Sequence, residues 1–129
     1  MRKVTTYTAA AIILASLVNT VSAMPPEQIK PVLNMTKDNW VSFRDYNGKQ
    51  LIYFTHLETY TCGIQQVRYS INSDVLDQTW ELQPCDPNNP LEITKEIIYL
   101  SLPLGTAKSI AVKLTFTDGS ESEIVRKTP

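Results

Sequence analysis

Apolar and polar residues alternate on both sides of Asn47-Gly48, within the stretch from Trp40 to His56. Asn-Gly between runs of aromatic and β-branched residues is the strongest short-range signal for a two-residue β-hairpin turn. Such a turn predicts that Tyr46 pairs with Lys49, because the residues that flank it must face each other. Side chains alternate along a strand, so one face of the hairpin is then apolar. That face carries the predicted pairs Phe43–Ile52 and Val41–Phe54.

The opposite face of this hairpin carries large aromatic side chains together with basic ones. An aromatic patch with a polar rim is typical of a recognition surface if solvent reaches it. We therefore predict a face that binds an envelope protein or a glycan. The alternative is that the opposing sheet or the N-terminal segment covers this face, which makes it ordinary core. The candidate binding residues are Trp40, Arg44, Tyr46 and Tyr53.

Residues 1–23 have the layout of a secretory signal peptide. Arg2 and Lys3 precede an apolar run from Ala9 to Val18, and Val21-Ser22-Ala23 places small residues before a cleavage point. The run is shorter than the roughly 20 residues of a membrane span. We therefore predict a secreted or periplasmic protein, with no stable membrane insertion after cleavage. An uncleaved membrane anchor is the alternative.

Prolines punctuate the next segment, residues 24–38, and predict an extended leader or an edge strand there. Each proline removes a backbone donor and restricts the residue before it to extended conformations. The candidate for the edge strand is Val32 to Thr36. A single β domain is predicted to follow, residues 39–129.

Further strands are predicted in the middle of the chain. Strand character extends from Thr59 to Cys62 and ends at Gly63, which predicts a bulge or bend. The strand from Ile64 to Ile71 has its first residue out of phase with its inward set, which predicts a change of face there. After a turn at Asn72-Ser73-Asp74, the strand from Thr79 to Leu82 returns.

The last third of the chain predicts three more strands. Ile97 to Leu102 is bounded by proline and glycine, and Ile110 to Phe116 alternates strictly. Asp118-Gly119 then turns the chain into Ser120 to Val125. A three-residue loop with Gly119 as a left-handed bulge keeps the apolar residues on the core side. That loop places Ser122 opposite Leu114 and Ile124 opposite Val112.

The pattern of seven to eight short strands, with no segment of helical period after the signal peptide, predicts an all-β fold. We expect an immunoglobulin-like antiparallel β-sandwich, with a small barrel as the alternative. The segment from Val67 to Asn72 is similar to a strand and turn found in immunoglobulin-like accessory domains of bacterial surface proteins. This resemblance implies architecture alone.

Cys62 and Cys85 are the only cysteines. An exported chain meets an oxidising compartment, so we predict that they form a disulfide bond. A turn centred on Ser73 and Asp74 would place them opposite each other, and the chain-entropy model gives a stabilisation of roughly 3 kcal/mol for a loop of about 22 residues. A free, reactive cysteine is the alternative.

Charge narrows the classes of partner. Without the signal peptide the chain has ten basic and thirteen acidic residues, and no basic cluster. This balance argues against nucleic acid as a partner. The acidic residues do not follow the spacing of a calcium loop, two cysteines with one histidine are too few for a zinc site, and no glycine-rich phosphate loop occurs. We therefore predict no cofactor and no metal.

His56 is the only histidine, and Glu58 lies on the same side of a strand that continues through both. A histidine beside a carboxylate can act as a general base. The other interpretation is a strand-end histidine that makes one structural hydrogen bond, and no nucleophile motif such as GxSxG accompanies it. We predict no catalytic residues and a non-enzymatic binding or accessory module of the periplasm or cell envelope. The alternative is a small secreted enzyme or enzyme inhibitor that uses His56 and nearby carboxylates.

Overall fold

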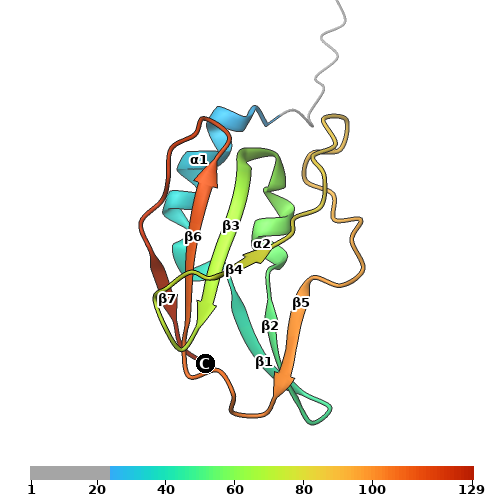
Figure 1. The fold of residues 1–129 in the computed structure, drawn as a ribbon. Helices are drawn as coiled ribbons and strands as arrows, with labels where there is room; N and C mark the ends of the chain where they lie inside the picture. The colour runs from blue at the N-terminus through green and yellow to red at the C-terminus, as the bar shows by residue number, and fades with distance from the viewer. Residues whose placement is uncertain (1–23) are drawn as a thin grey trace, which may run out of the picture.

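A computed structural model describes residues 24–129, which form seven strands in two antiparallel sheets (Figure 1). The first sheet has three strands in the order β1-β2-β5, and the second has four in the order β4-β3-β6-β7. The predicted sandwich-like arrangement of strands is therefore confirmed, but the predicted all-β character is not, because the chain is mostly β and also contains helices. The predicted signal peptide, residues 1–23, lies outside the described residues. Among residues 24–129 there is no helix with the length and apolar character needed to cross a membrane.

The hairpin predicted around Asn47-Gly48 is present, with β1 (Ser42–Tyr46) paired to β2 (Lys49–Tyr53). Asn47 and Gly48 have positive φ angles, 52° and 76°, as a type I′ turn requires. The turn chemistry therefore sets the register of the two strands. That register pairs Tyr46 with Lys49 and Phe43 with Ile52, as predicted.

Strand β5 (Tyr99–Pro103) completes the first sheet by pairing with the other edge of β2. It begins two residues later than the predicted strand and ends one residue later. Its side chains Leu100 and Leu102 lie in register with Ile52 and Gln50 and share the inner face of the sheet with them.

The second sheet is centred on β3 (Ile64–Ile71), which lies between β4 (Gln78–Trp80) and β6 (Ile110–Phe116). Strand β7 (Val125–Lys127) pairs with the far edge of β6. The register between β3 and β6 shifts after the first residue of β3. The predicted change of face at the start of this strand is therefore confirmed.

The turn after β6 confirms one of the two pairings predicted for it and contradicts the other. The N–H of Ser122 donates to the carbonyl of Leu114 at 2.8 Å, so these two residues lie opposite each other as predicted. The predicted pairing of Ile124 with Val112 is wrong, because Val125 occupies that place. The hydroxyl of Ser122 accepts the N–H of Leu114 at 2.8 Å. A side chain thus replaces a backbone acceptor, and the ladder slips by one residue.

The segment predicted as an extended leader or edge strand is helical. Residues 24–38 contain helix α1 (Pro26–Met35) and most of the 3₁₀ turn η1 (Lys37–Asn39). Ile29 and Leu33 are fully buried, and their spacing of four residues places them on one side of α1. Burial of this apolar stripe stabilises the helix. Two residues are too few to show a helical period in the sequence.

The prolines that suggested an extended segment are compatible with α1. Pro25 precedes the helix and Pro26 lies in its first turn, where a backbone N–H has no partner within the helix in any case. Pro31 alone lies inside the helix and removes an internal donor.

The predicted strand from Thr59 to Cys62 is also wrong. The chain forms the short helix α2 (Thr55–Thr59) and the 3₁₀ turn η2 (Thr61–Gly63). At Gly63, where a bulge was predicted, α1 makes a close approach. A Cβ atom on Gly63 would lie 2.4 Å from Cγ2 of Ile29, so only glycine allows this contact.

The apolar core lies between the two sheets and is extended by residues of α1 and α2 (Figure 1). The predicted inward residues Val41, Ile52 and Phe54 are buried, and Phe43 packs against them while half-buried. The ring of Phe54 stacks on Trp80 of the second sheet, with centroids 4.2 Å apart. This contact packs the residue between β2 and α2 against the second sheet.

The predicted disulfide is present between Cys62 and Cys85, whose Cα atoms are 4.7 Å apart. The β3–β4 register pairs Val67 with Trp80. Counting outward from that pair brings Cys62 opposite Cys85, as the predicted turn implied. The bond ties η2 to the long connection between β4 and β5.

Candidate functional site

The outer face of the three-stranded sheet brings together three of the four predicted binding residues and one residue that was not predicted. In the observed register Tyr53 lies between Ser42 and Tyr99, while Arg44 and Tyr46 lie further along β1. Because side chains alternate, these positions share one side of the sheet. The tyrosine face, as we name it, consists of Arg44, Tyr46, Tyr53 and Tyr99.

The aromatic rings of the tyrosine face are held by their neighbours. The guanidinium of Arg44 lies over the ring of Tyr46, 4.3 Å from its centroid, which is a cation–π contact. Tyr53 and Tyr99 pair across β2 and β5 with centroids 5.3 Å apart. Tyr46 is 56% exposed, whereas Leu51 on the same side is only 7% exposed. The rings therefore have defined neighbours, and the ring of Tyr46 is open to solvent.

Charge on this side of the sheet is positive. Within residues 24–129 neither Arg44 nor Lys49 has a carboxylate within ion-pair distance, whereas six other basic residues do. No acidic side chain shares the outward positions of the three strands. These positions are Ser42, Arg44, Tyr46, Lys49, Leu51, Tyr53, Tyr99, Ser101 and Pro103.

Trp40 does not belong to this surface, and its predicted place there is wrong. It is fully buried, and its indole N–H donates to the carbonyl of Leu33 at 2.9 Å. Strand β1 begins at Ser42, and Trp40 has a helical conformation at the end of η1. The alternation of the strand therefore does not extend back to Trp40, which packs with α1 instead.

The predicted pairing of His56 with Glu58 does not occur. Both residues lie in α2, where a separation of two residues places side chains on opposite sides of the helix. Nε2 of His56 contacts the hydroxyl of Thr36 at 2.8 Å, and this hydroxyl donates to the carbonyl of Val32. The imidazole packs edge-on against Tyr60. Burial lowers the pKa of His56.

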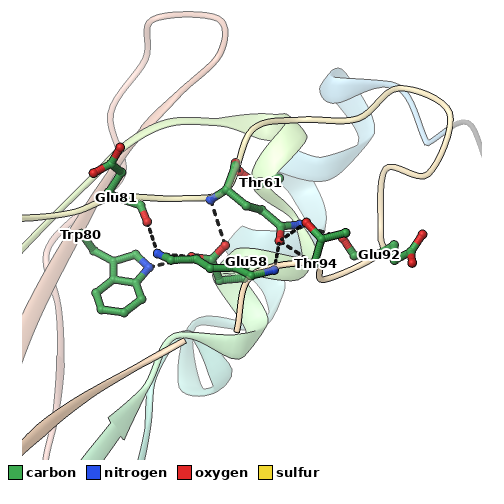
Figure 2. Close-up of polar contacts among 8 residues, drawn as sticks. Glu58, Thr61, Trp80, Glu81, Glu92 and Thr94 are labelled. Carbon is green, nitrogen blue, oxygen red and sulfur yellow. Dashed lines mark hydrogen bonds and ion pairs between the residues drawn. The ribbon is translucent and has the colours of Figure 1, made fainter. Parts of the chain in front are cut away.

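Glu58 is instead the centre of a buried polar network that the sequence did not reveal (Figure 2). Its carboxylate has no exposed surface and accepts hydrogen bonds from the indole of Trp80 at 2.8 Å and from the backbone of Gln83 at 3.0 Å. Lys95 Nζ lies 3.3 Å from it and 4.2 Å from the centroid of the Trp80 ring. The carboxylate is thus fully satisfied, as a buried charge must be.

Gln83 extends this network into the connection between β4 and β5. Its side-chain nitrogen donates to the carbonyl of Glu92 at 2.7 Å, and its side-chain oxygen accepts the N–H of Thr94 at 2.9 Å. Thr61 donates its hydroxyl to the carbonyl of Gln83 at 2.7 Å. All these groups are occupied within the protein, so the network holds a loop and offers no free reactive group.

A hollow of about 710 Å³ lies beside the disulfide and is lined mainly by β3, β4 and the segment after β4. Its wall includes Gln65, Gln66, Thr79 and Thr115, and Glu81 is its one carboxylate. Catalytic clefts bring several titratable groups together, and this hollow does not. Across residues 24–129 no three His, Cys, Asp or Glu side chains are grouped as a metal site would require.

Comparison with known proteins gives no relative: no family model, no curated protein and no solved structure matches the chain. Tyr99 was not predicted as a binding residue, because nothing in the sequence shows which strand pairs with the far edge of β2. Its alternation with Ser101 was the available signal for its side of the strand.

Proposed function

We propose that this protein is an exported, non-enzymatic binding or accessory module of the periplasm or cell envelope. It contacts a partner protein or a glycan through the tyrosine face. The observation that carries the proposal is the exposed Tyr46 ring beneath the Arg44 guanidinium, on a side of the sheet without acidic residues. Tyrosine and arginine are the residues that dominate binding energy at many interfaces.

The fold and the disulfide support the same setting. Disulfide bonds persist in oxidising compartments such as the periplasm and the extracellular space, and Cys62–Cys85 is bonded. Two antiparallel sheets that enclose a common core are compatible with an immunoglobulin-like sandwich, an architecture that serves binding in many cell-surface proteins. We therefore also propose that the fold is an immunoglobulin-like sandwich.

Photo-crosslinking in the cell of origin tests the proposal. A photoreactive phenylalanine derivative replaces Tyr46, and in a control protein it replaces Val75, which is 69% exposed in the turn between β3 and β4. We expect an adduct at position 46 that disappears when Arg44 is changed to Ala, and no equivalent adduct at position 75. Equal adducts at both positions, or none at position 46, would contradict the proposal.

A further inference from the structure

The two sheets part where β5 faces β3, and an open groove of about 290 Å³ lies between them. Apolar side chains of both strands line it: Tyr69 and Ile71 from β3, and Leu100 and Leu102 from β5. Except for Tyr69, these side chains are half-buried. The polar residues Asp77 and Gln78 also line it and are exposed. The groove therefore presents unfilled apolar surface beside a polar rim.

Strand β5 is an edge of its sheet with open backbone groups. The N–H of Phe54 donates to the carbonyl of Ile98 at 2.8 Å. Bonded pairs alternate along an antiparallel ladder, so Leu100 and Leu102 bond to β2, while the N–H and C=O groups of Tyr99 and Ser101 point away from it. Within residues 24–129 these four groups have no hydrogen-bond partner from outside the sheet.

The other sheet edges carry features that discourage pairing with another chain. Strand β1 has the charged residues Arg44 and Asp45, β7 has Arg126 and Lys127 in three residues, and β4 is also only three residues long. Charges and shortness protect an edge. Strand β5 has five residues, none of them charged, and its proline is the last one.

We propose that the β5 edge binds an extended peptide segment of another protein by strand addition. Main-chain hydrogen bonds to Tyr99 and Ser101 supply affinity, and alternate apolar side chains of the peptide enter the groove beside Leu100 and Leu102. This site goes beyond the proposed function, because it uses the edge and the inner side of the sheet whose outer side is the tyrosine face.

Charge at the rim specifies the peptide further. Asp77 has no cation within ion-pair distance in the described part of the chain. After burial, its negative charge is the second cause that raises the pKa of Tyr69, so the carboxylate lies close to the groove. A lysine or arginine next to the apolar positions of the peptide would complement it.

A selection from a phage-displayed library of random twelve-residue peptides tests this site, with the protein expressed from the full-length chain and oxidised. We expect enriched peptides with alternating apolar residues and a lysine or arginine. Addition of such a peptide should slow hydrogen exchange of the Tyr99 and Ser101 amides by about tenfold or more, because exchange requires an unpaired N–H.

Variants separate edge pairing from other modes of binding. Ser101→Pro removes an outward N–H, a change that edge strands tolerate, and should lower peptide affinity by about tenfold or more, whereas Ser101→Ala should keep it within about twofold. Asp77→Asn should weaken binding of the basic peptide and leave its glutamine-substituted version unchanged. Tyr46→Ala should not affect peptide binding, so failure here and failure of the tyrosine face are distinguishable.

Three results would overturn the inference. The first is enrichment of peptides without alternation, or no enrichment. The second is unchanged hydrogen exchange of the Tyr99 and Ser101 amides when peptide is bound to the wild-type protein. This measurement does not depend on whether the Ser101→Pro variant folds. The third is concentration-dependent protection of the two amides without peptide, because the occupant would then be a second copy of this chain.

Discussion

At the scale of single residues, Glu58 is the clearest case of a side chain whose role depends on tertiary contacts. It has no exposed surface, yet it carries a carboxylate that Lys95 and Trp80 bind. The sequence placed it beside His56 because a strand was expected there. The helical geometry of α2 turns it toward the connection between β4 and β5 instead.

Glu58→Ala should be strongly destabilising. It leaves the indole N–H of Trp80 and the N–H of Gln83 without their acceptor, and it removes the ion-pair partner of Lys95, whose ammonium keeps the carbonyl of Glu81. The loss of these contacts should cost about 3–5 kcal/mol in total. Urea unfolding at neutral pH measures the loss. Glu96→Ala is the matched control, because Glu96 is exposed on the same connection, and it should cost under about 1 kcal/mol. Equal losses for the two variants would show that the network does not stabilise the protein.

The candidate binding residues show where alternation along the sequence predicts the side of a strand correctly and where it does not. Arg44, Tyr46 and Tyr53 lie within the range of the Asn47-Gly48 turn, and the turn alone places them on one side. Trp40 lies two residues before the first residue of β1, where the conformation is already helical. Nothing local marks that change, so alternation assigned Trp40 to the wrong environment.

At the scale of elements, strands were predictable and short helices were not. Strands β1, β2, β3 and β6 follow from alternation and turn residues, which act over a few positions. Helix α1 buries only two residues of its ten, so its period is nearly invisible. Its formation depends on the turn η2 and the core residues that receive Ile29 and Leu33, partners that the sequence alone does not identify.

Substitution on α1 distinguishes this docked helix from an extended leader. Leu33→Ala removes a fully buried side chain and should cost about 2–5 kcal/mol. Met35→Ala, at an 85% exposed position of the same helix, should change stability by less than about 0.5 kcal/mol. Thermal unfolding followed by circular dichroism gives both values. A Leu33→Ala protein that unfolds like the wild type would mean that the helix does not pack on the core.

The disulfide connects an element to a loop, and its loss should loosen that loop. Cys62→Ser with Cys85→Ser should lower stability by roughly 2–4 kcal/mol, because the unfolded chain regains the freedom of the closed loop. Denaturant titration of the oxidised protein and the double variant measures this difference. Thiol labelling of the native wild-type protein without reductant should find no free cysteine, and two labelled thiols would contradict the bond.

At the scale of the whole molecule, the sequence predicted two facing sheets but not what surrounds them. Turn residues and alternation define strands and near-neighbour pairing, as the β3–β4 register and the disulfide illustrate. The pairing of β2 with β5 spans a connection without regular structure. Such non-local contacts depend on packing of the complete core. This pairing adds Tyr99 to the tyrosine face and places Leu100 and Leu102 in the groove beside β5.

The stability of the whole protein should fall in two separate steps as the pH is lowered. Burial lowers the pKa of His56 below its usual 6.5. As the pH falls, the histidine therefore takes up a proton in the unfolded chain before it does so in the folded protein. The free energy of unfolding declines as the pH falls from about 6.5 through the folded pKa. Hydrogen bonds from Ser120, with that of Lys30, lower the pKa of Asp118 to about 2. The pKa of Glu123 is lowered by Lys37.

These carboxylates contribute to the free energy of unfolding above their usual pKa values. This contribution is lost as the pH falls through the lowered pKa values of the folded protein. Urea unfolding at about pH 7.5, 5.5 and 3 resolves the two steps, because the histidine titrates above the carboxylates. His56→Gln should remove the decline between the first two values and keep the decline below about pH 5. Asp118→Asn should keep the decline between the first two pH values and make the decline below about pH 5 shallower. A His56→Gln protein that retains the full first decline would show that His56 is not its source, because the chain has no other histidine.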